Sequence, residues 1–402
     1  MSPRPFTGNF TQQEPIGEDA VAAAVEVLRS GRLHRYNTSG DELSEASLLE
    51  RDYAGYQGSR YCLACASGGY ALQISLRAAG LQPGEPVLTN AFTLAPVPGA
   101  IVNAGGQPVF VETTRDLVID LDDLDRKRTA SGARFLMLSH MRGHLVDMDR
   151  LAAFAEAHGM ILIEDCAHTM GAQWRGRNSG SFGLAGCFST QTYKHLNSGE
   201  GGLVTSDDAG FMARAILLSG SYMQYERHGA APAPEAFADL RLETPNWSGR
   251  MDNLRAAILR PQLAGLDANC VRWNARYQTL ERQLRTAGNL FLPVRPAEER
   301  YVGSSIQFLI PNISETAARD FVAATMALGV ELKWFGDDEP VAFTSNHKSW
   351  RYLERQSLPN TDAILSGLFD MRIPLTFSLE DCAQIGDIIV FCAQAVSNRS
   401  AA

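Results

Sequence analysis

The sequence predicts an α/β protein, with a large domain built on a mostly parallel sheet and a smaller α+β domain at the carboxyl-terminal end. Two observations support this prediction. Through the first half of the chain, short apolar runs alternate with amphipathic stretches, as in parallel strands covered by helices on both faces. The chain has 402 residues, 45% of them hydrophobic, which is enough to bury one large core and a smaller one.

The large domain is predicted to follow an amino-terminal helix and an arm. Residues 18–29 have a helical pattern that ends at Gly31, and the polar stretch 37–44 is predicted to be a mobile arm. Beyond the arm, apolar runs and helical patterns alternate. The predicted strands are residues 86–90, 107–112, 134–140, 160–164, 185–190 and 202–206, and the predicted helices are residues 68–79, 94–103, 147–158 and 208–219.

The smaller domain is predicted from a change of pattern near Met251. Residues 251–286 are predicted to form one long helix that links the two domains, with a kink at Pro261. Strand-like runs at 305–310 and 330–334 and helical patterns at 315–328 and 379–397 follow. We therefore divide the chain into residues 1–45, the amino-terminal helix and arm; 46–260, the large domain; and 261–402, the linking helix and small domain.

Charge and hydropathy argue against nucleic-acid and membrane partners. The 36 basic and 45 acidic residues give a net charge of −9, and no basic run typical of phosphate-backbone binding occurs. The start of the sequence lacks the apolar stretch of a secretory signal, and no apolar segment approaches the roughly 20 residues that span a bilayer. We expect a cytoplasmic protein.

The seven cysteines do not indicate a disulfide framework, and four of them are predicted to pack as small hydrophobic residues. An odd number argues against a disulfide framework, and Cys62, Cys65, Cys166 and Cys187 lie in or beside apolar, strand-like stretches. Cys62 and Cys65 form a Cys-x-x-Cys pair, but no second pair lies at zinc-site spacing. We therefore expect no metal site.

Two segments at the ends of predicted strands carry chemically active residues. Ligands of open α/β sheets bind beyond the carboxyl ends of the strands. Glu164 and Asp165 end one apolar run, where a carboxylate is desolvated unless it meets a positive partner. The ordinary alternative is an aspartate that caps the next helix. The functional interpretation is that one of these carboxylates pairs with a bound cation.

The second segment contains Lys194. A single lysine is most often a solvated surface charge. Lys194, however, follows Ser189 by five residues and precedes Gly199, Gly201 and Gly202, a setting that indicates tight backbone turns around a ligand.

Together these segments resemble the DegT/DnrJ/EryC1/StrS, or sugar-aminotransferase, family of enzymes that use pyridoxal phosphate (PLP). The resemblance covers nearly the whole chain and implies the aspartate-aminotransferase fold (fold type I), with residues 46–260 as the PLP-binding domain. It also implies a homodimer whose active sites lie at the subunit interface. The matching segments are Ala-Ser-Gly-Gly-Tyr-Ala-Leu (66–72), Gly-Gln-Pro-Val-Phe-Val (106–111), His-Met-Arg-Gly-His-Leu-Val-Asp-Met-Asp (140–149), Glu-Asp-Cys-Ala-His (164–168), Ser-x-x-x-x-Lys (189–194), Ser-Gly-Glu-Gly-Gly (198–202) and Gly-Arg-Met-Asp-Asn-Leu-Arg-Ala-Ala (249–257).

The resemblance implies catalytic roles for Lys194 and Asp165 and a place at the cofactor for His168. Lys194 is expected to form the internal aldimine and then to move the proton of the 1,3-shift, which requires a lowered lysine pKa. Asp165 is expected to pair with the pyridine nitrogen and keep it protonated, so that the ring accepts electrons. His168 is expected near the ring hydroxyl, with a structural histidine as the alternative.

Further residues are expected to bind the cofactor. Gly68 and Gly69 open a helix whose amides and dipole receive the phosphate, and Ser189 supplies another contact. The family usually has Ser-Gly-Thr where this chain has Ser67-Gly68-Gly69, so one hydroxyl contact is absent. Phe92 matches a position whose ring stacks on the pyridine, with core packing as the ordinary alternative.

A last phosphate contact is expected across the dimer interface. In the family it comes from an asparagine near an Arg-Met pair, which makes Asn246 and Arg250 the candidates. The usual spacing is Asn-x-Arg, whereas this chain has Asn-Trp-Ser-Gly-Arg.

The implied activity is a ping-pong transamination. An amino acid, L-glutamate or L-glutamine, converts the cofactor to pyridoxamine phosphate, and the amine then passes to a ketone such as a nucleotide-linked keto-sugar or a keto-cyclitol. One alternative is the sugar dehydratase branch, which has a histidine in place of the lysine; His195 is adjacent, but the fifth residue after Ser189 is Lys194. Another is a regulatory protein that binds PLP without turnover. A nicotinamide-dependent oxidoreductase is disfavoured because no Gly-x-Gly-x-x-Gly follows an early strand.

Some residues are candidate substrate contacts because of their place in the sequence. His140, Arg142 and His144 follow a predicted strand and either form a cationic cluster for an anionic acceptor or are solvated loop residues. The stretches 32–37 and 333–335 are further candidates.

Overall fold

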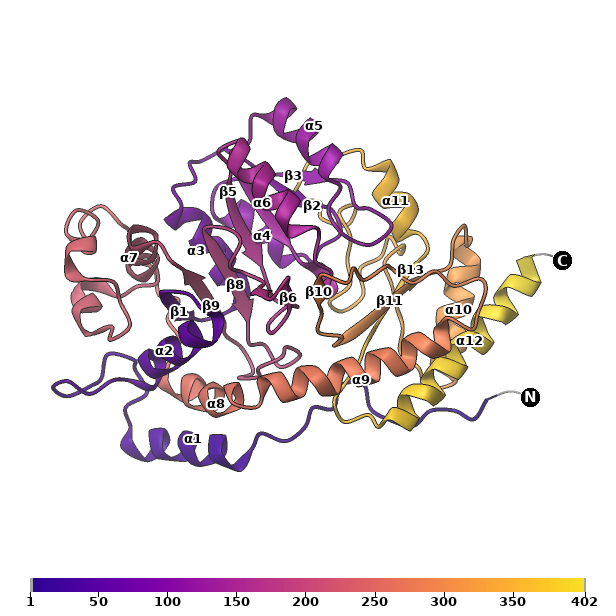
Figure 1. Cartoon of the computed structure of the whole chain (residues 1–402), viewed down its shortest axis with the longest axis horizontal. Helices are drawn as coiled ribbons and strands as arrows, with labels where there is room; N and C mark the ends of the chain where they lie inside the picture. Colours follow the sequence, from indigo (N-terminus) through magenta and orange to yellow (C-terminus); the bar gives the residue numbers. More distant parts are fainter. Residues whose placement is uncertain (1–2, 401–402) are drawn as a thin grey trace.

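A seven-stranded sheet forms the centre of the large domain. The structure is a computed structural model that describes residues 3–400, with side chains described up to residue 396 (Figure 1). The strand order is β1-β9-β8-β5-β4-β2-β3, and β9 is antiparallel to both of its neighbours while the other neighbours are parallel. The strands are β1 (Tyr61–Cys65), β2 (Pro86–Asn90), β3 (Gln107–Val111), β4 (Phe135–Ser139), β5 (Ile161–Asp165), β8 (Ala185–Ser189) and β9 (Gly202–Ser206).

Both faces of this sheet are covered by helices, which explains the nearly continuous apolar runs of its strands. Successive side chains point to opposite faces. Phe135 and Met137 face one helical layer, and Leu136 and Leu138 face the other. The first layer contains α3 (Gly68–Ala78), α4 (Pro96–Asn103) and α7 (Ala209–Leu218); the second contains α2 (Glu45–Gln57), α5 (Leu121–Ser131), α6 (Met148–Ala157) and α8 (Asn253–Leu263).

The linking segment is two helices, so the prediction of one helix over 251–286 was wrong. Helix α8 ends at Leu263 and α9 (Leu266–Leu284) begins after a break at Ala264–Gly265 (Figure 1). Pro261 lies inside α8 and has no N–H to donate to the carbonyl four residues earlier, which weakens the last turn. The chain therefore breaks just after the proline instead of bending at it.

The smaller domain is built on a three-stranded antiparallel sheet. Its order is β11 (Ser305–Leu309), β13 (Leu368–Arg372) and β12 (Lys333–Trp334). Ile306, Phe308, Phe369 and Met371 form its apolar face and pack into one core with α9, α10 (Glu315–Ala327) and α12 (Leu379–Ser400). The opposite face carries polar side chains, which lie toward the site described below.

The amino-terminal residues also belong to this core. Phe6 and Phe10 lie in it, and both rings contact Phe377, with ring centres 5.0 and 4.9 Å away. From there the chain continues into α1 (Glu18–Ser30), which packs against α8. Helix α1 ends at Gly31 in a left-handed conformation, as expected. The segment 37–44 connects α1 to α2, and Ser44 caps α2.

Most predicted elements are confirmed to within three residues at either end. Strand 330–334 is shorter than predicted, since only Lys333–Trp334 pairs with β13. Within the described residues, no helix is long and apolar enough to cross a bilayer. The elements that were not predicted are α2, α5, α11 (Pro359–Leu365), β13, the hairpin β6 (Gln173–Trp174) and β7 (Arg177–Asn178), its neighbour β10 (Glu299–Arg300), and the 3-10 turns Met141–Gly143, Tyr222–Arg227 and Pro234–Phe237.

Candidate active site

The carboxyl ends of three neighbouring parallel strands lie side by side. Ser139 ends β4, Asp165 ends β5 and Ser189 ends β8. Ser139 pairs with Asp165 in register, and β8 lies on the other side of β5. The loop after β8 carries Lys194 and returns into β9 at Gly202, which pairs with Ser189. The sheet thus brings the predicted carboxylate, lysine and serine to one edge.

Asp165 is a buried carboxylate held in a fixed orientation. Its side chain is only 7% exposed. One oxygen accepts a hydrogen bond from the Ser139 hydroxyl at 2.8 Å, and the other accepts from the Ala167 amide at 3.1 Å. Both donors are uncharged groups, and together they fix the orientation of the carboxylate.

Lys194 and His168 lie within hydrogen-bond distance. Nζ of Lys194 is 3.0 Å from Nε2 of His168. Burial, together with the positive charge of Arg142, lowers the pKa of Lys194 to about 7, against the opposing effect of Asp165. Burial and the neighbouring Lys194 hold the pKa of His168 well below its usual value. Near neutral pH a large fraction of the Lys194 amine is therefore uncharged and nucleophilic.

The start of α3 lies against Ser189. Ser67 caps the helix by accepting from the Tyr70 amide at 3.1 Å, so the first amides, those of Gly68 and Gly69, have no partner inside the helix. A Cβ atom on Gly68 would lie 2.7 Å from the Ser189 Cβ, which explains the glycine. On Gly69 the nearest atom, in Pro96, would be 3.8 Å away, so a larger residue has room there.

Arg250 lies near this helix start through its backbone. The Ala66 amide donates to the Gly249 carbonyl at 2.7 Å, and Arg250 forms a bridge with Cys65. The Arg250 guanidinium donates to the Gly220 carbonyl. Asn246 accepts from the Tyr222 amide at 2.7 Å. Both side chains thus hold the 220–222 loop of their own chain, and their expected role across a dimer interface stays a prediction.

Phe92 is packed in the core between the two domains. Its side chain is 1% exposed and meets Phe335 edge to face, with ring centres 5.2 Å apart. The same cluster contains Leu117, Met141 and Leu368. The structure therefore shows the core packing that was the ordinary alternative for this residue, and stacking on a cofactor ring stays a prediction.

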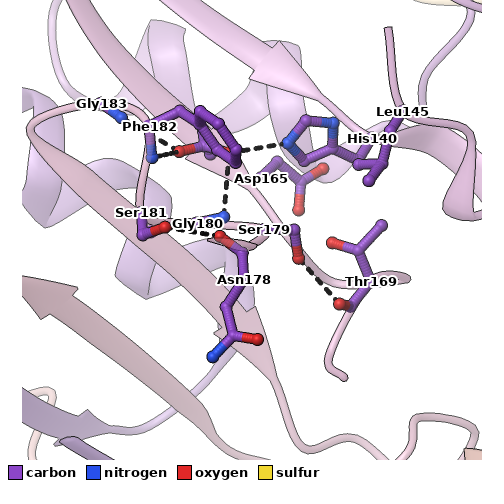
Figure 2. Close-up of polar contacts among 12 residues, drawn as sticks. His140, Leu145, Asp165, Thr169, Asn178, Ser179, Gly180, Ser181, Phe182 and Gly183 are labelled. Atoms are coloured by element: carbon purple, nitrogen blue, oxygen red, sulfur yellow. Dashed lines mark hydrogen bonds and ion pairs between the residues drawn. The ribbon is translucent and has the colours of Figure 1, made fainter. Parts of the chain in front are cut away.

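Glu164 points away from Asp165 and fastens a loop to the sheet. One of its oxygens accepts from the amides of Phe182 and Gly183, and the other from the Gly180 amide and His140 Nε2, all within 3.1 Å (Figure 2). Figure 2 also shows the loop closed on itself by the Ser181 hydroxyl on the Asn178 carbonyl and joined to Thr169 by Ser179.

These contacts argue against a metal site at the same place. His140, Glu164 and Cys166 have ligand atoms within 4.8 Å of one another. The four hydrogen bonds to Glu164, however, use the lone pairs that an ion would need, and burial holds the pKa of the Cys166 thiol well above its usual value. The seven cysteines are all free and buried, which confirms the predicted burial of the four in or beside strand-like stretches.

In the structure, the three residues of the expected cluster, His140, Arg142 and His144, have different partners. All three are buried, so the solvated-loop alternative was wrong. His140 contacts Glu164, and His144 Nε2 lies 2.8 Å from the Gln307 side-chain oxygen. Burial and the charge of Arg295 hold the pKa of His144 well below its usual value, so it is not a cation. Of the three, Arg142 is the residue whose positive charge contributes to the lowered pKa of Lys194.

Sequence reasoning missed the partner of Arg142. Asp370, on the unpredicted strand β13, lies 2.8 Å from Arg142 and 3.6 Å from Lys333. Arg372, two residues further on the same face of β13, lies over the ring of Tyr193 at 3.8 Å from its centre. The available signal was the alternation of charged and apolar residues in Leu-Phe-Asp-Met-Arg.

Comparisons with known proteins agree with this arrangement. The profile of the DegT/DnrJ/EryC1/StrS aminotransferase family matches residues 14–390. The chain belongs to this family. It is a PLP-dependent aminotransferase of fold type I, as the sequence predicted.

Named relatives include a cyclitol aminotransferase and a regulatory protein. It is 30% identical to the L-glutamine:2-deoxy-scyllo-inosose aminotransferase of Streptomyces lividus over 285 residues, which are 69% of this chain and 65% of that protein. It is 29% identical to a pleiotropic regulatory protein of Geobacillus stearothermophilus over 295 residues, 72% of this chain and 73% of the other.

Solved structures show the same fold over almost the full length. DesV of S. venezuelae, in complex with a ketimine intermediate, superposes with a TM-score of 0.80 at 25% identity over 98% of this chain and 99% of DesV. A 3-amino-5-hydroxybenzoic acid synthase superposes with a TM-score of 0.81 at 24% identity over 98% of this chain and all of the other.

The residues at the sheet edge fit PLP, the cofactor of this family. The cradle of Gly68 and Ser189 suits a dianionic phosphate, since free helix amides and the helix dipole attract anions. The buried Asp165 suits a protonated ring nitrogen. Lys194 supplies an amine whose pKa of about 7 suits covalent attachment to an aldehyde.

Proposed function

We propose that this aminotransferase moves the amino group of L-glutamate or L-glutamine to a ketone, a keto-cyclitol or a nucleotide-linked keto-sugar. The amino donor and the cyclitol acceptor are those in the name of the S. lividus relative, and the sugar acceptor follows from the family resemblance. The observation that carries the proposal is the proximity of an amine of lowered pKa, on Lys194, to the buried carboxylate of Asp165 at one sheet edge.

In this proposal each residue has a distinct task. PLP, when bound, supplies a ring that accepts the electron pair released at the substrate carbon. Asp165 holds the proton on the ring nitrogen. Lys194 holds the cofactor covalently and, once released by the amino donor, carries the proton between the substrate carbon and the cofactor carbon. Ser189 and the amides of Gly68 and Gly69 bind the phosphate.

His168 is proposed as the residue that keeps the Lys194 amine ready for this proton transfer. It contacts Nζ at 3.0 Å, and its own lowered pKa keeps the imidazole neutral, so that it accepts a hydrogen bond without adding charge. A homodimer is part of the proposal, with Asn246 and Arg250 reaching the partner's phosphate site.

A spectroscopic half-reaction tests the function. The protein is loaded with PLP, and L-glutamate or L-glutamine is added without any ketone. We expect the visible band of the lysine-bound cofactor to be replaced by the absorbance of pyridoxamine phosphate. Keto-cyclitols and keto-sugars are then screened for return of the original band.

Two other functions are distinguished by the same experiment. The similarity to a pleiotropic regulatory protein favours a PLP-binding regulator as the second candidate. Such a protein would bind PLP and show no conversion with either amino acid. A sugar dehydratase of the same family would consume a sugar substrate without transferring an amine from L-glutamate or L-glutamine.

A further inference from the structure

The residues on both sides of Lys194 contact the small domain. Nε2 of His195 lies 3.0 Å from the hydroxyl oxygen of Ser304, which directly precedes β11. On the other side of the lysine, the guanidinium of Arg372 on β13 lies over the ring of Tyr193. Lys194 itself points the other way, toward the loop after β5. The lysine is therefore held between two contacts with the small domain.

The same loop is fastened a third time at Asn197. Its amide donates to the side-chain oxygen of Gln262 on α8 at 3.0 Å, and its carbonyl accepts from the nitrogen of that side chain at 2.8 Å. Leu196 is buried in the core of the large domain. Odd-numbered residues from 193 to 197 thus contact the small domain or α8, while the two between them face the large domain. Because neighbouring residues share a rigid peptide unit, a shift of His195 moves Lys194 as well.

The contact between His195 and Ser304 belongs to a closed ring of interactions. The Ser304 carbonyl accepts from the Ile373 amide at 2.9 Å. The Ile373 carbonyl accepts from the indole N–H of Trp273 on α9 at 3.0 Å. The Trp273 ring meets the His195 ring edge to face, with ring centres 5.0 Å apart. His195 is thus joined to the small domain and to the linking helix, so its position is fixed from two sides.

His195 is a buried and uncharged side chain. It is 6% exposed, and its Nδ1 has no hydrogen-bond partner among the described residues. Burial and the charge of Lys194 lower the pKa of His195 to about 3, so the ring stays neutral over the range in which Lys194 titrates. Its one hydrogen bond is directed to Ser304 and not to the Lys194 amine. This geometry favours a positioning role over an acid–base role.

We propose that His195 is a positioning residue for Lys194, which fixes the reacting amine by tying the lysine loop to Ser304 of the small domain. The proposal rests on the role given to Lys194 in the proposed function. A lysine side chain has many conformers, so the backbone that carries it has to be held for the amine to meet its target. A misplacement of about 1 Å can cost a factor of about 10² in rate.

Capture of PLP by the protein without cofactor tests this tether. In this reaction the Lys194 amine forms a C=N bond with the aldehyde carbon and water leaves, and growth of the visible band records the step. His195→Leu and Ser304→Ala should each slow this growth about tenfold, since each removes the same hydrogen bond. His195→Gln, whose amide reaches Ser304, should stay within about threefold of the wild type.

Pyridoxine phosphate separates positioning from general disruption of the site. It has an alcohol in place of the aldehyde, so it makes the phosphate and ring contacts without reacting with Lys194. Its Kd, measured by calorimetry, should stay within about twofold of the wild type in His195→Leu and Ser304→Ala. Thermal unfolding midpoints show that the variants are folded. His158→Leu, at an exposed histidine after α6, is the matched control and should capture PLP like the wild type.

A double variant shows whether His195 and Ser304 act as one unit. A shared tether is lost only once, so the variant with both His195→Leu and Ser304→Ala should be within about twofold of the slower single variant. Independent effects would instead multiply to a loss of about a hundredfold.

Four results would overturn the tether. They are a wild-type capture rate in both single variants, a Kd for pyridoxine phosphate that rises as much as capture slows, a multiplicative loss in the double variant, and capture by His195→Gln as slow as by His195→Leu. A wild-type protein that captures PLP but is not converted by L-glutamate or L-glutamine would refute the proposed function and leave the tether standing.

Discussion

The Lys194 amine and the His168 imidazole lie 3.0 Å apart although one follows β8 and the other follows β5. Both are titratable groups in a buried setting, and the positive charge of Lys194 contributes to the lowered pKa of His168. A lysine in this state differs in reactivity from a surface lysine over the physiological pH range, and that difference is measurable.

Capture of PLP by the protein without cofactor should level off above neutral pH. The uncharged amine attacks the aldehyde, and with a pKa of about 7 its fraction rises only about tenfold between pH 6 and pH 8. A lysine of ordinary pKa would give about a hundredfold rise over the same range. The initial rate of growth of the visible band measures this, with Nα-acetyl-lysine run in parallel to correct for titration of PLP. A hundredfold rise in the protein would show that Lys194 is not perturbed.

Gly68 and Gly69 should respond differently to the same substitution. Gly68→Ala brings a Cβ within 2.7 Å of the Ser189 Cβ and displaces Ser189, a residue of the proposed phosphate cradle. Overpacking of this kind costs about 1–3 kcal/mol, so the Kd for PLP should rise roughly tenfold. Gly69→Ala meets no atom closer than 3.8 Å and should stay within about twofold of the wild type. Equal effects of the two substitutions would mean that the cradle is elsewhere.

Asp165→Asn should slow the half-reaction without releasing the cofactor. The amide keeps the shape of the carboxylate but cannot stabilise a protonated ring nitrogen, and loss of one such electrostatic group costs roughly 10²–10³ in rate. Single-turnover absorbance with L-glutamate gives the rate. Asp149→Asn, at a carboxylate 52% exposed on α6, is the matched control. A wild-type rate in Asp165→Asn would remove this residue from the mechanism.

Glu164→Gln should destabilise the large domain. The carboxylate accepts three backbone amides and contacts His140, and a glutamine side chain has one acceptor oxygen in place of two. Loss of these bonds should lower the free energy of unfolding by about 3 kcal/mol, measured by urea titration. Metal chelators should leave the unfolding midpoint of the wild type unchanged, whereas a bound structural ion would make it fall.

The large domain was predictable because its signals are local. Strands such as Ile161–Asp165 are continuous apolar runs, and the polar residues that end them fall at one sheet edge by the rules of parallel sheets. The site residues Asp165, Ser189 and Lys194 were found in this way, with the family resemblance supplying their roles. Their tasks in catalysis are still predictions.

The missed elements carry charge where apolar residues were expected. Helix α5 is rich in Asp and Arg and buries only Leu124 among its apolar residues, so no apolar stripe marks it. Strand β13 contains the buried Asp370, which interrupts the apolar pattern. Because the partners of Asp370 come from β12 and from the loop after β4, its burial depends on contacts between distant segments that periodicity does not report.

Covalent trapping at Lys194 tests the central claim most directly. The PLP-loaded protein is reduced with borohydride, digested and mapped by mass spectrometry, with Lys194→Ala as the comparison. We expect the reduced phosphopyridoxyl adduct on Lys194 in the wild type and its absence in the variant. An adduct on another side chain, or none in the wild type, would contradict the account.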